Sequence, residues 1–109
     1  MKFGRNGRFR ELIDRQLDLF AEDDRELLVE ADEAEHAWSR SGAEDAEEAF
    51  GDYQLVVDAI GDRLLDIRES YARTLDDAAA AEYSAEFTRA ATRRYRRYAS
   101  LLADYDNED

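Results

Sequence analysis

The chain has 109 residues, a formal net charge of −13, no Cys and no Pro. That length suffices for one domain with a modest core, and the absence of Cys excludes disulfide scaffolds, thiolate nucleophiles and zinc–thiolate sites. No apolar stretch is long enough for a membrane span, and the basic first ten residues lack the apolar centre of a signal peptide. We therefore expect a cytoplasmic protein without a membrane span.

Charge is segregated along the chain. Residues 1–10 carry +4, residues 11–50 carry −12 and residues 51–87 carry −6. Residues 88–103 then carry +5, and residues 104–109 carry −4. This pattern predicts an electrostatic match between the acidic first half and the basic late segment.

Apolar positions recur at steps of three and four through residues 8–40, which predicts a first helix. The step from Phe20 to Asp24 is four where a strict heptad needs three, which indicates either a stutter in one helix or a break near residues 22–24. A D-x-x-E capping pattern favours a break, whereas the lack of Gly and Pro favours continuity. We predict one helix over residues 8–40, either straight or kinked. Its stripe consists of Phe9, Ile13, Gln16, Phe20, Asp24, Leu27, Ala31, Ala34 and Trp38.

The strongest turn signal is Ser39-Arg40-Ser41-Gly42, in which Ser41 is a candidate cap for the next helix and Gly42 a candidate terminator of the previous one. A second helix is predicted over residues 44–76, because an a/d heptad seam continues there for about four heptads. The seam consists of Ala46, Phe50, Tyr53, Val57, Ile60, Leu64, Ile67 and Tyr71.

Asp76 and Asp77 precede an Ala run, and Asp is a good N-cap, so a third helix is predicted from about residue 77 to residue 105. Its stripe consists of Phe87, Ala91, Arg94, Tyr98, Leu101 and Tyr105.

Three helices of similar length with short connections predict an all-α fold, an antiparallel three-helix bundle with coiled-coil-like heptad packing. The predicted organisation is a flexible basic arm over residues 1–7, one bundle domain over residues 8–105 and an acidic tail over residues 106–109. The alternative joins the second and third helices into one long rod, which gives a helical hairpin that dimerises.

In such a bundle the first and third helices run parallel. Arg94 lies 17 residues after Asp77, and 17 residues after Arg8 is Arg25, so Arg94 is level with Asp24. We predict an Arg94–Asp24 contact as a structural polar pair in the seam; the alternative is that Arg94 extends outward along its aliphatic stem.

The only His stands in a Glu-x-x-His pair, Glu33 and His36. Ferritin-like metal bundles use this spacing, because it places carboxylate and imidazole on one helix face, and a dimeric metal-binding bundle is therefore an alternative function. The stripe through Leu27, Ala31 and Trp38 leaves His36 on the opposite face, so we expect a solvated His, no metal site and no cofactor.

Five Arg residues between positions 89 and 97 are interleaved with Tyr. We expect them to pair with acids of the first two helices or with an acidic protein. Nucleic acid is not an expected partner, since a chain of charge −13 repels it. The candidate partner-binding residues are Arg89, Arg93, Arg96 and Arg97.

The early helix, Trp38 before the turn, Gly42 and the second long helix resemble the secreted Trp-x-Gly helical hairpins of Gram-positive bacteria. Here Gly follows Trp by four places rather than two. Tyr105-x-x-x-Asp109 resembles the export signal of that family. The resemblance implies a secreted helical hairpin as another alternative function.

No arrangement of Ser, His and acid and no Gly-rich phosphate loop is visible, so we expect no catalytic residues and no enzyme activity. The function predicted first is a small acidic helical protein that acts as a protein–protein interaction or adaptor module. The expected partner is another protein or a second copy of this chain.

Overall fold

The computed structural model describes residues 7–99 and residue 102, and there the chain forms four α-helices and no strand. The predicted all-helical class is confirmed. Most of the predicted basic arm, all of the acidic tail and the Tyr105–Asp109 pattern lie outside the described residues. The helices are α2 (Arg10–Asp23), α3 (Arg25–Ser39), α4 (Ala46–Ala72) and α5 (Asp77–Arg94).

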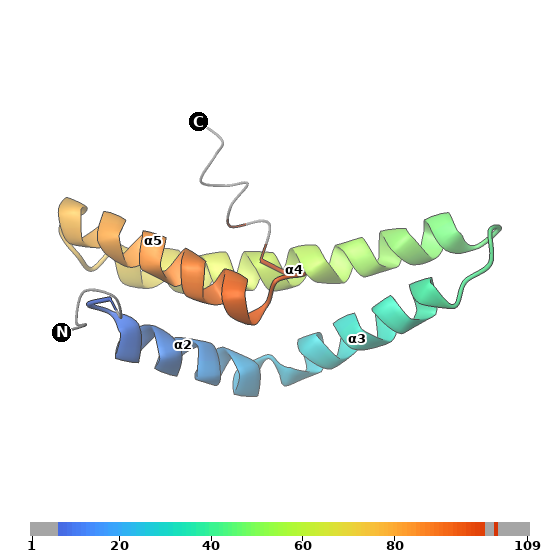
Figure 1. Cartoon of the computed structure of the whole chain (residues 1–109), viewed down its shortest axis with the longest axis horizontal. Coiled ribbons are helices and arrows are strands. Elements are labelled where there is room, and N and C mark those ends of the chain that lie inside the picture. Colours follow the sequence, from blue (N-terminus) through green and yellow to red (C-terminus); the bar gives the residue numbers. More distant parts are fainter. Residues whose placement is uncertain (1–6, 100–101, 103–109) are drawn as a thin grey trace.

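The helices form three antiparallel runs. Helices α2 and α3 follow one another along α4, which runs in the opposite direction, and α5 returns beside α2 and the C-terminal half of α4 (Figure 1). The N-terminal half of α4 faces α3. The molecule therefore has one region where α2, α4 and α5 meet and another where α3 and α4 pair without α5.

The single helix predicted for residues 8–40 is wrong, and the alternative of a break near residues 22–24 is confirmed, because the chain leaves helical geometry at Asp24 (φ −110°, ψ 29°). The Asp24 N–H closes α2 on the Phe20 carbonyl at 2.8 Å, and α3 begins as the Leu27 N–H donates to the Asp24 carbonyl at 3.0 Å. The Asp24 carboxylate makes no cap hydrogen bond and instead accepts from Arg63 Nε on α4 at 3.1 Å. The extra residue in the heptad spacing thus corresponds to a break between α2 and α3, and the bond from Arg63 on α4 stabilises this break.

The turn after α3 forms differently from the prediction, and the turn after α4 forms as predicted. Ser41 Oγ donates to the Trp38 carbonyl at 2.7 Å, so it closes α3 rather than capping α4. Gly42 does not have a positive φ. The Asp76 carboxylate accepts from the Ala79 N–H at 2.9 Å, which confirms the predicted cap and separates α5 from α4. Helix α4 fills most of the predicted 44–76 span.

The third helix is shorter than predicted, since α5 ends at Arg94 rather than near residue 105. The Tyr95 N–H closes the helix on the Ala91 carbonyl at 2.8 Å, and the Tyr95 ring packs edge-on against Phe20 with centroids 5.5 Å apart. Residues 95–99 form no regular helix, and Tyr98, Ala99 and Leu102 are buried. The end of α5 is therefore set by aromatic packing on α2.

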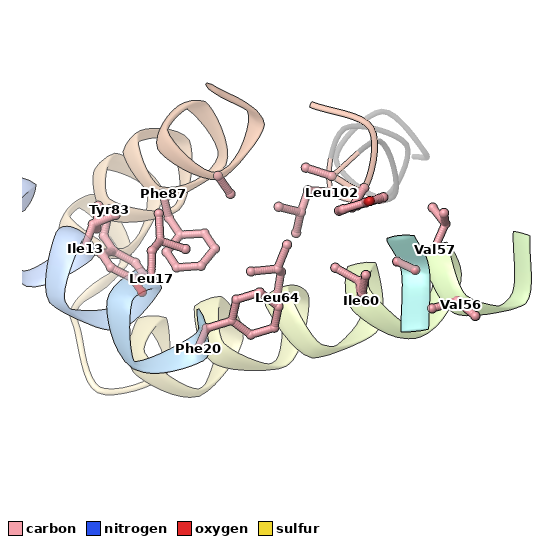
Figure 2. Close-up of a cluster of buried hydrophobic side chains, with 14 of the residues drawn as sticks. Ile13, Leu17, Phe20, Val56, Val57, Ile60, Leu64, Tyr83, Phe87 and Leu102 are labelled. Atoms are coloured by element: carbon pink, nitrogen blue, oxygen red, sulfur yellow. The ribbon is translucent and has the colours of Figure 1, made fainter. Parts of the chain in front are cut away.

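The buried apolar side chains form one cluster that draws on all four helices and on the segment after α5. Figure 2 shows side chains of α2, α4 and α5 pointing into this shared interior. Of the eight predicted α4 seam positions, four are buried and only Phe50 is exposed. The least exposed large apolar residues are Ile13, Leu17, Phe20, Ile60, Leu64, Tyr83, Phe87 and Leu102.

The start of α2 is closed by a side chain from α5. Phe9 provides no cap of its own, and its N–H donates to Glu86 Oε1 at 3.2 Å. Gly7 precedes it with φ +82°, and a Cβ at Gly7 would overlap the Glu86 carboxylate. Because a carboxylate at a helix N-terminus also complements the helix dipole, buried Glu86 stabilises α2 from a distant part of the sequence.

Candidate protein-interaction surfaces

Most of the net charge lies in one part of the molecule, residues 26–62, which we call the acidic half. It comprises most of α3, the connecting turn and the first part of α4, and it holds twelve acidic residues and one basic residue, Arg40. The rest of the chain holds 16 acidic and 14 basic residues. The acidic half therefore carries −11 of the net −13.

The acids of this half are exposed and, with one exception, not neutralised by the fold. Glu35 forms an ion pair with Arg97. The other eleven acids are exposed and form no ion pair with any residue that the structure describes. Like charges at this density repel one another, so a cationic partner would relieve that repulsion.

The same half also exposes apolar side chains. Five large hydrophobic residues are exposed in the described part of the chain, and Leu19 is the one outside the acidic half. Leu55 on α4 is 70% exposed, more than any other of the five. The four in the acidic half are Val29, Trp38, Phe50 and Leu55.

A groove of about 450 Å³ runs between α3 and α4 in the acidic half. Its α4 side comprises Ala49, Asp52, Leu55 and Val56, and its α3 side comprises Glu30, Glu33, Ala34 and Ala37. These positions repeat at steps of three and four, so each set forms one stripe of its helix. We call its apolar lining, Ala34, Ala37, Ala49, Leu55 and Val56, the floor, and its three carboxylates, Glu30, Glu33 and Asp52, the rim.

Aromatic rings pack across the end of the α3–α4 pair. The Trp38 ring stacks on Tyr53 with centroids 5.4 Å apart and contacts Phe50 at 4.8 Å. Trp38 was predicted as a stripe residue facing the interior, and it remains over one-third exposed. The cluster holds the two helices together where α5 does not reach, so an apolar surface remains exposed there.

The segment after α5 covers the opposite face of the same helix pair. Arg97 forms a hydrogen bond with Glu35. Glu35 is two residues from Glu33, which lines the groove, so the two side chains point about 200° apart around α3. Tyr98 is buried beside it, and burial raises the pKa of its hydroxyl. That hydroxyl has no hydrogen-bond partner among the described residues. One face of the α3–α4 pair is thus covered and the groove face is open.

The predicted Arg residues divide into paired and unpaired groups. Arg94 donates to Asp18 at 2.9 Å, and Arg97 pairs with Glu35, as expected for pairing with acids of the first helical region. Arg89, Arg93 and Arg96 are exposed and form no ion pair within the described residues. We call these three residues the Arg stripe.

The predicted Arg94–Asp24 contact is wrong, because the register between α2 and α5 differs from the assumed one. The prediction aligned Asp77 with Arg8, whereas the structure pairs Arg8 with Glu82 at 3.2 Å. Arg94 follows Glu82 by twelve residues, which places it near residue 20 and within reach of Asp18. Because of this five-residue shift Asp24 does not face Arg94, and it forms an ion pair with Arg63 on α4 instead.

Glu33 and His36 do not converge on one site. Glu33 lines the α3–α4 groove, whereas exposed His36 lies in a separate hollow with Asp32, Glu35 and Ser39. Within the described residues, no group of three or more His, Asp or Glu side chains is arranged to hold a metal ion. The metal-binding alternative therefore gains no support from the geometry.

Two buried charged residues, Arg68 and Glu86, were not singled out from the sequence. Arg68 is 2% exposed and donates to Glu69 Oε2 at 2.9 Å and to Thr88 Oγ1 on α5 at 2.6 Å. Neither residue occupies a predicted heptad stripe position, so periodicity gave no signal. Both connect α5 to the rest of the fold, which indicates structural roles.

The chain matches no protein-family model, no curated protein and no solved structure in the comparisons made. The resemblance to Trp-x-Gly hairpins thus gains no support from them. Of the helices that the structure describes, none has the length and apolar character needed to cross a bilayer. Function is therefore argued from the surfaces themselves.

Proposed function

We propose that the protein is a non-enzymatic interaction module that binds a basic protein through its acidic half. One observation carries the proposal: among the residues that the structure describes, this region holds eleven exposed acids that form no ion pair there and four of the five exposed large hydrophobic residues. Interfaces combine an apolar centre with a charged rim, and exposed apolar side chains gathered in one region mark binding surfaces. The charge selects a cationic partner.

The Arg stripe supplies a second surface of opposite sign, which suits an adaptor with two partners. Arg89, Arg93 and Arg96 follow one another at steps of four and three on the outer side of α5 and just beyond it. Their neighbours Arg94 and Arg97 form ion pairs with Asp18 and Glu35, respectively. The stripe is therefore free to bind an acidic protein surface.

The finer architecture proposed with this function is a three-membered bundle in which α2 and α3 act as one bent arm. The buried seam residues Tyr53, Val57, Ile60 and Leu64 support heptad packing along α4. A cytoplasmic location suits a chain without Cys.

The test is affinity capture with the full chain and two charge-matched variants. One variant neutralises four acids of the acidic half, Glu30→Gln, Glu33→Gln, Asp52→Asn and Asp58→Asn. The control neutralises four exposed acids elsewhere, Glu11→Gln, Glu22→Gln, Asp23→Asn and Asp77→Asn. We expect basic proteins bound by the wild type to be lost with the first variant and retained with the control. Equal capture by the two variants, or no specific capture, contradicts the proposal.

The Arg stripe is tested in the same way. We expect Arg89→Ser, Arg93→Ser and Arg96→Ser together to release any acidic partner. The matched control replaces three exposed Arg residues outside the stripe, Arg15, Arg25 and Arg40, with Ser. Retention of every partner by the stripe variant contradicts the adaptor role.

A further inference from the structure

We propose that the α3–α4 groove is a docking site for a cationic amphipathic α-helix of another protein. This inference rests on the proposed function and adds the place and the form of the partner. The apolar floor and acidic rim of the groove match a helix that has an apolar stripe flanked by Lys or Arg.

The shape of the groove fits a helix. On each side the lining residues span eight positions, 30–37 on α3 and 49–56 on α4, which is about 10 Å or two helical turns at 1.5 Å per residue. The two lining stripes run antiparallel, because a short turn connects the helices. A groove between two antiparallel helices accepts the ridge of a third.

The small side chains of the floor allow close approach. Ala34, Ala37 and Ala49 place only a methyl group between the docked helix and the two backbones. Leu55 lines the same groove and is largely exposed, so it is positioned to pack on an apolar side chain of the docked helix. Shielding Leu55 from water would supply apolar burial to the complex.

The charge of the rim determines the sign of the ligand. Glu30, Glu33 and Asp52 are exposed and form no ion pair with a described residue. A docked Lys or Arg flanking an apolar stripe would reach these carboxylates while its own helix lies on the Ala floor. A helix with acidic flanks would meet like charges instead.

A second copy of this chain does not fit the groove. Two acidic halves repel one another, each carrying −11. The Arg stripe offers three cations, but α5 exposes no large hydrophobic residue among its described positions to enter the floor. The intrachain cover formed by Tyr98 lies on the opposite face.

The experiment uses three labelled helix-forming peptides and the full chain. The first peptide carries Leu at i, i+3, i+4 and i+7 with Lys on both flanks. The second contains the same residues with Leu distributed around the helix, and the third has Glu in place of Lys. Fluorescence anisotropy is measured at low and at physiological ionic strength.

We expect the first peptide to bind, more weakly at higher ionic strength, and the other two to bind at least about tenfold more weakly, which corresponds to 1.4 kcal/mol. Two uncharged changes in the groove, Ala37→Trp and Leu55→Gln, should each weaken the first peptide several-fold. The matched changes Ala85→Trp on α5 and Leu19→Gln on α2 should leave it unchanged. Circular dichroism checks that each variant retains its helices.

Equal binding of the first two peptides, with no effect of either groove variant, overturns the docking site. Because the groove variants keep the net charge, this result would leave a general acidic-half interaction intact. Self-association that Ala37→Trp abolishes would assign the groove to a second copy and also overturn the proposal.

Discussion

The two regions of this molecule are built on different principles. We call α2, residues 63–72 of α4 and α5 the α5 half, and we compare it with the acidic half. In the α5 half, three helices enclose most of the largest buried side chains, and ion pairs connect α5 to α2 and to Arg8 just before it. In the acidic half, two helices pair, a short irregular segment covers one face, and acids and apolar side chains face solvent. The α5 half therefore holds most of the buried core, and under the proposed function the acidic half supplies recognition.

The largest expected contrast comes from removing one apolar side chain in each half. Phe87→Ala should lower the free energy of unfolding by about 3–5 kcal/mol, because a ring that is fully buried leaves a cavity. Leu55→Ala should change it by less than about 0.5 kcal/mol, because Leu55 is exposed. Urea denaturation measures both. Similar losses at the two positions would refute the division between the halves.

A second contrast concerns glycine. Gly7→Ala should lower the free energy of unfolding by about 1–3 kcal/mol, because φ is +82° and the new Cβ would overlap Glu86. Gly51→Ala should raise the free energy of unfolding by about 1 kcal/mol, because Gly51 lies inside α4 with nothing within 4 Å of the new Cβ. The midpoint temperatures of thermal denaturation of the two variants should shift in opposite directions relative to the wild type. A shift in the same direction would contradict the proposed role of Gly7.

The third contrast is in pH dependence. Burial raises the pKa of the Tyr83 hydroxyl to about 12, and this hydroxyl donates to Gln16 Oε1 at 2.8 Å. Between pH 10 and 12 the unfolded chain loses this proton while the folded chain keeps it, so stability is full below pH 10 and falls as pH rises through that window.

Tyr83→Phe should therefore flatten the alkaline loss of stability. It should also cost about 1 kcal/mol at neutral pH, because Gln16 Oε1 loses its donor. Urea denaturation at a series of pH values tests both effects. An alkaline limb as steep as that of the wild type would show that Tyr83 does not govern it.

The last contrast is at Tyr98, which covers one face of the acidic half. Its buried hydroxyl has no partner in the part of the chain that the structure describes, so Tyr98→Phe removes an unsatisfied polar group. We expect no loss of stability and a gain of at most about 1 kcal/mol. A loss as large as that of Tyr83→Phe would contradict this.

Periodicity predicted the helical class and the interior of α4 well, since buried positions at steps of three and four depend on local geometry alone. It did not predict where helices end. The break at Asp24 depends on Arg63, and the end of α5 depends on Tyr95 meeting Phe20. Both partners are remote in sequence, so no local pattern contains them.

The candidate surfaces were predictable only in part. The sequence indicated that late Arg residues pair with earlier acids, and Arg94 and Arg97 do so. It gave the wrong acid for Arg94, because pairing of Arg8 with Glu82 shifts the register by five residues. The groove was not predicted, because its two sides come from α3 and α4 and depend on how these two helices pack together.

The contact between Glu86 and the Phe9 N–H has a consequence for biosynthesis. The two residues are 77 positions apart, so the first helix emerges from the ribosome long before the carboxylate that completes its start. Closing so long a loop also slows folding relative to contacts between neighbours. We therefore expect α2 to acquire its full protection from amide hydrogen exchange only after Glu86 has been synthesised and has left the ribosome.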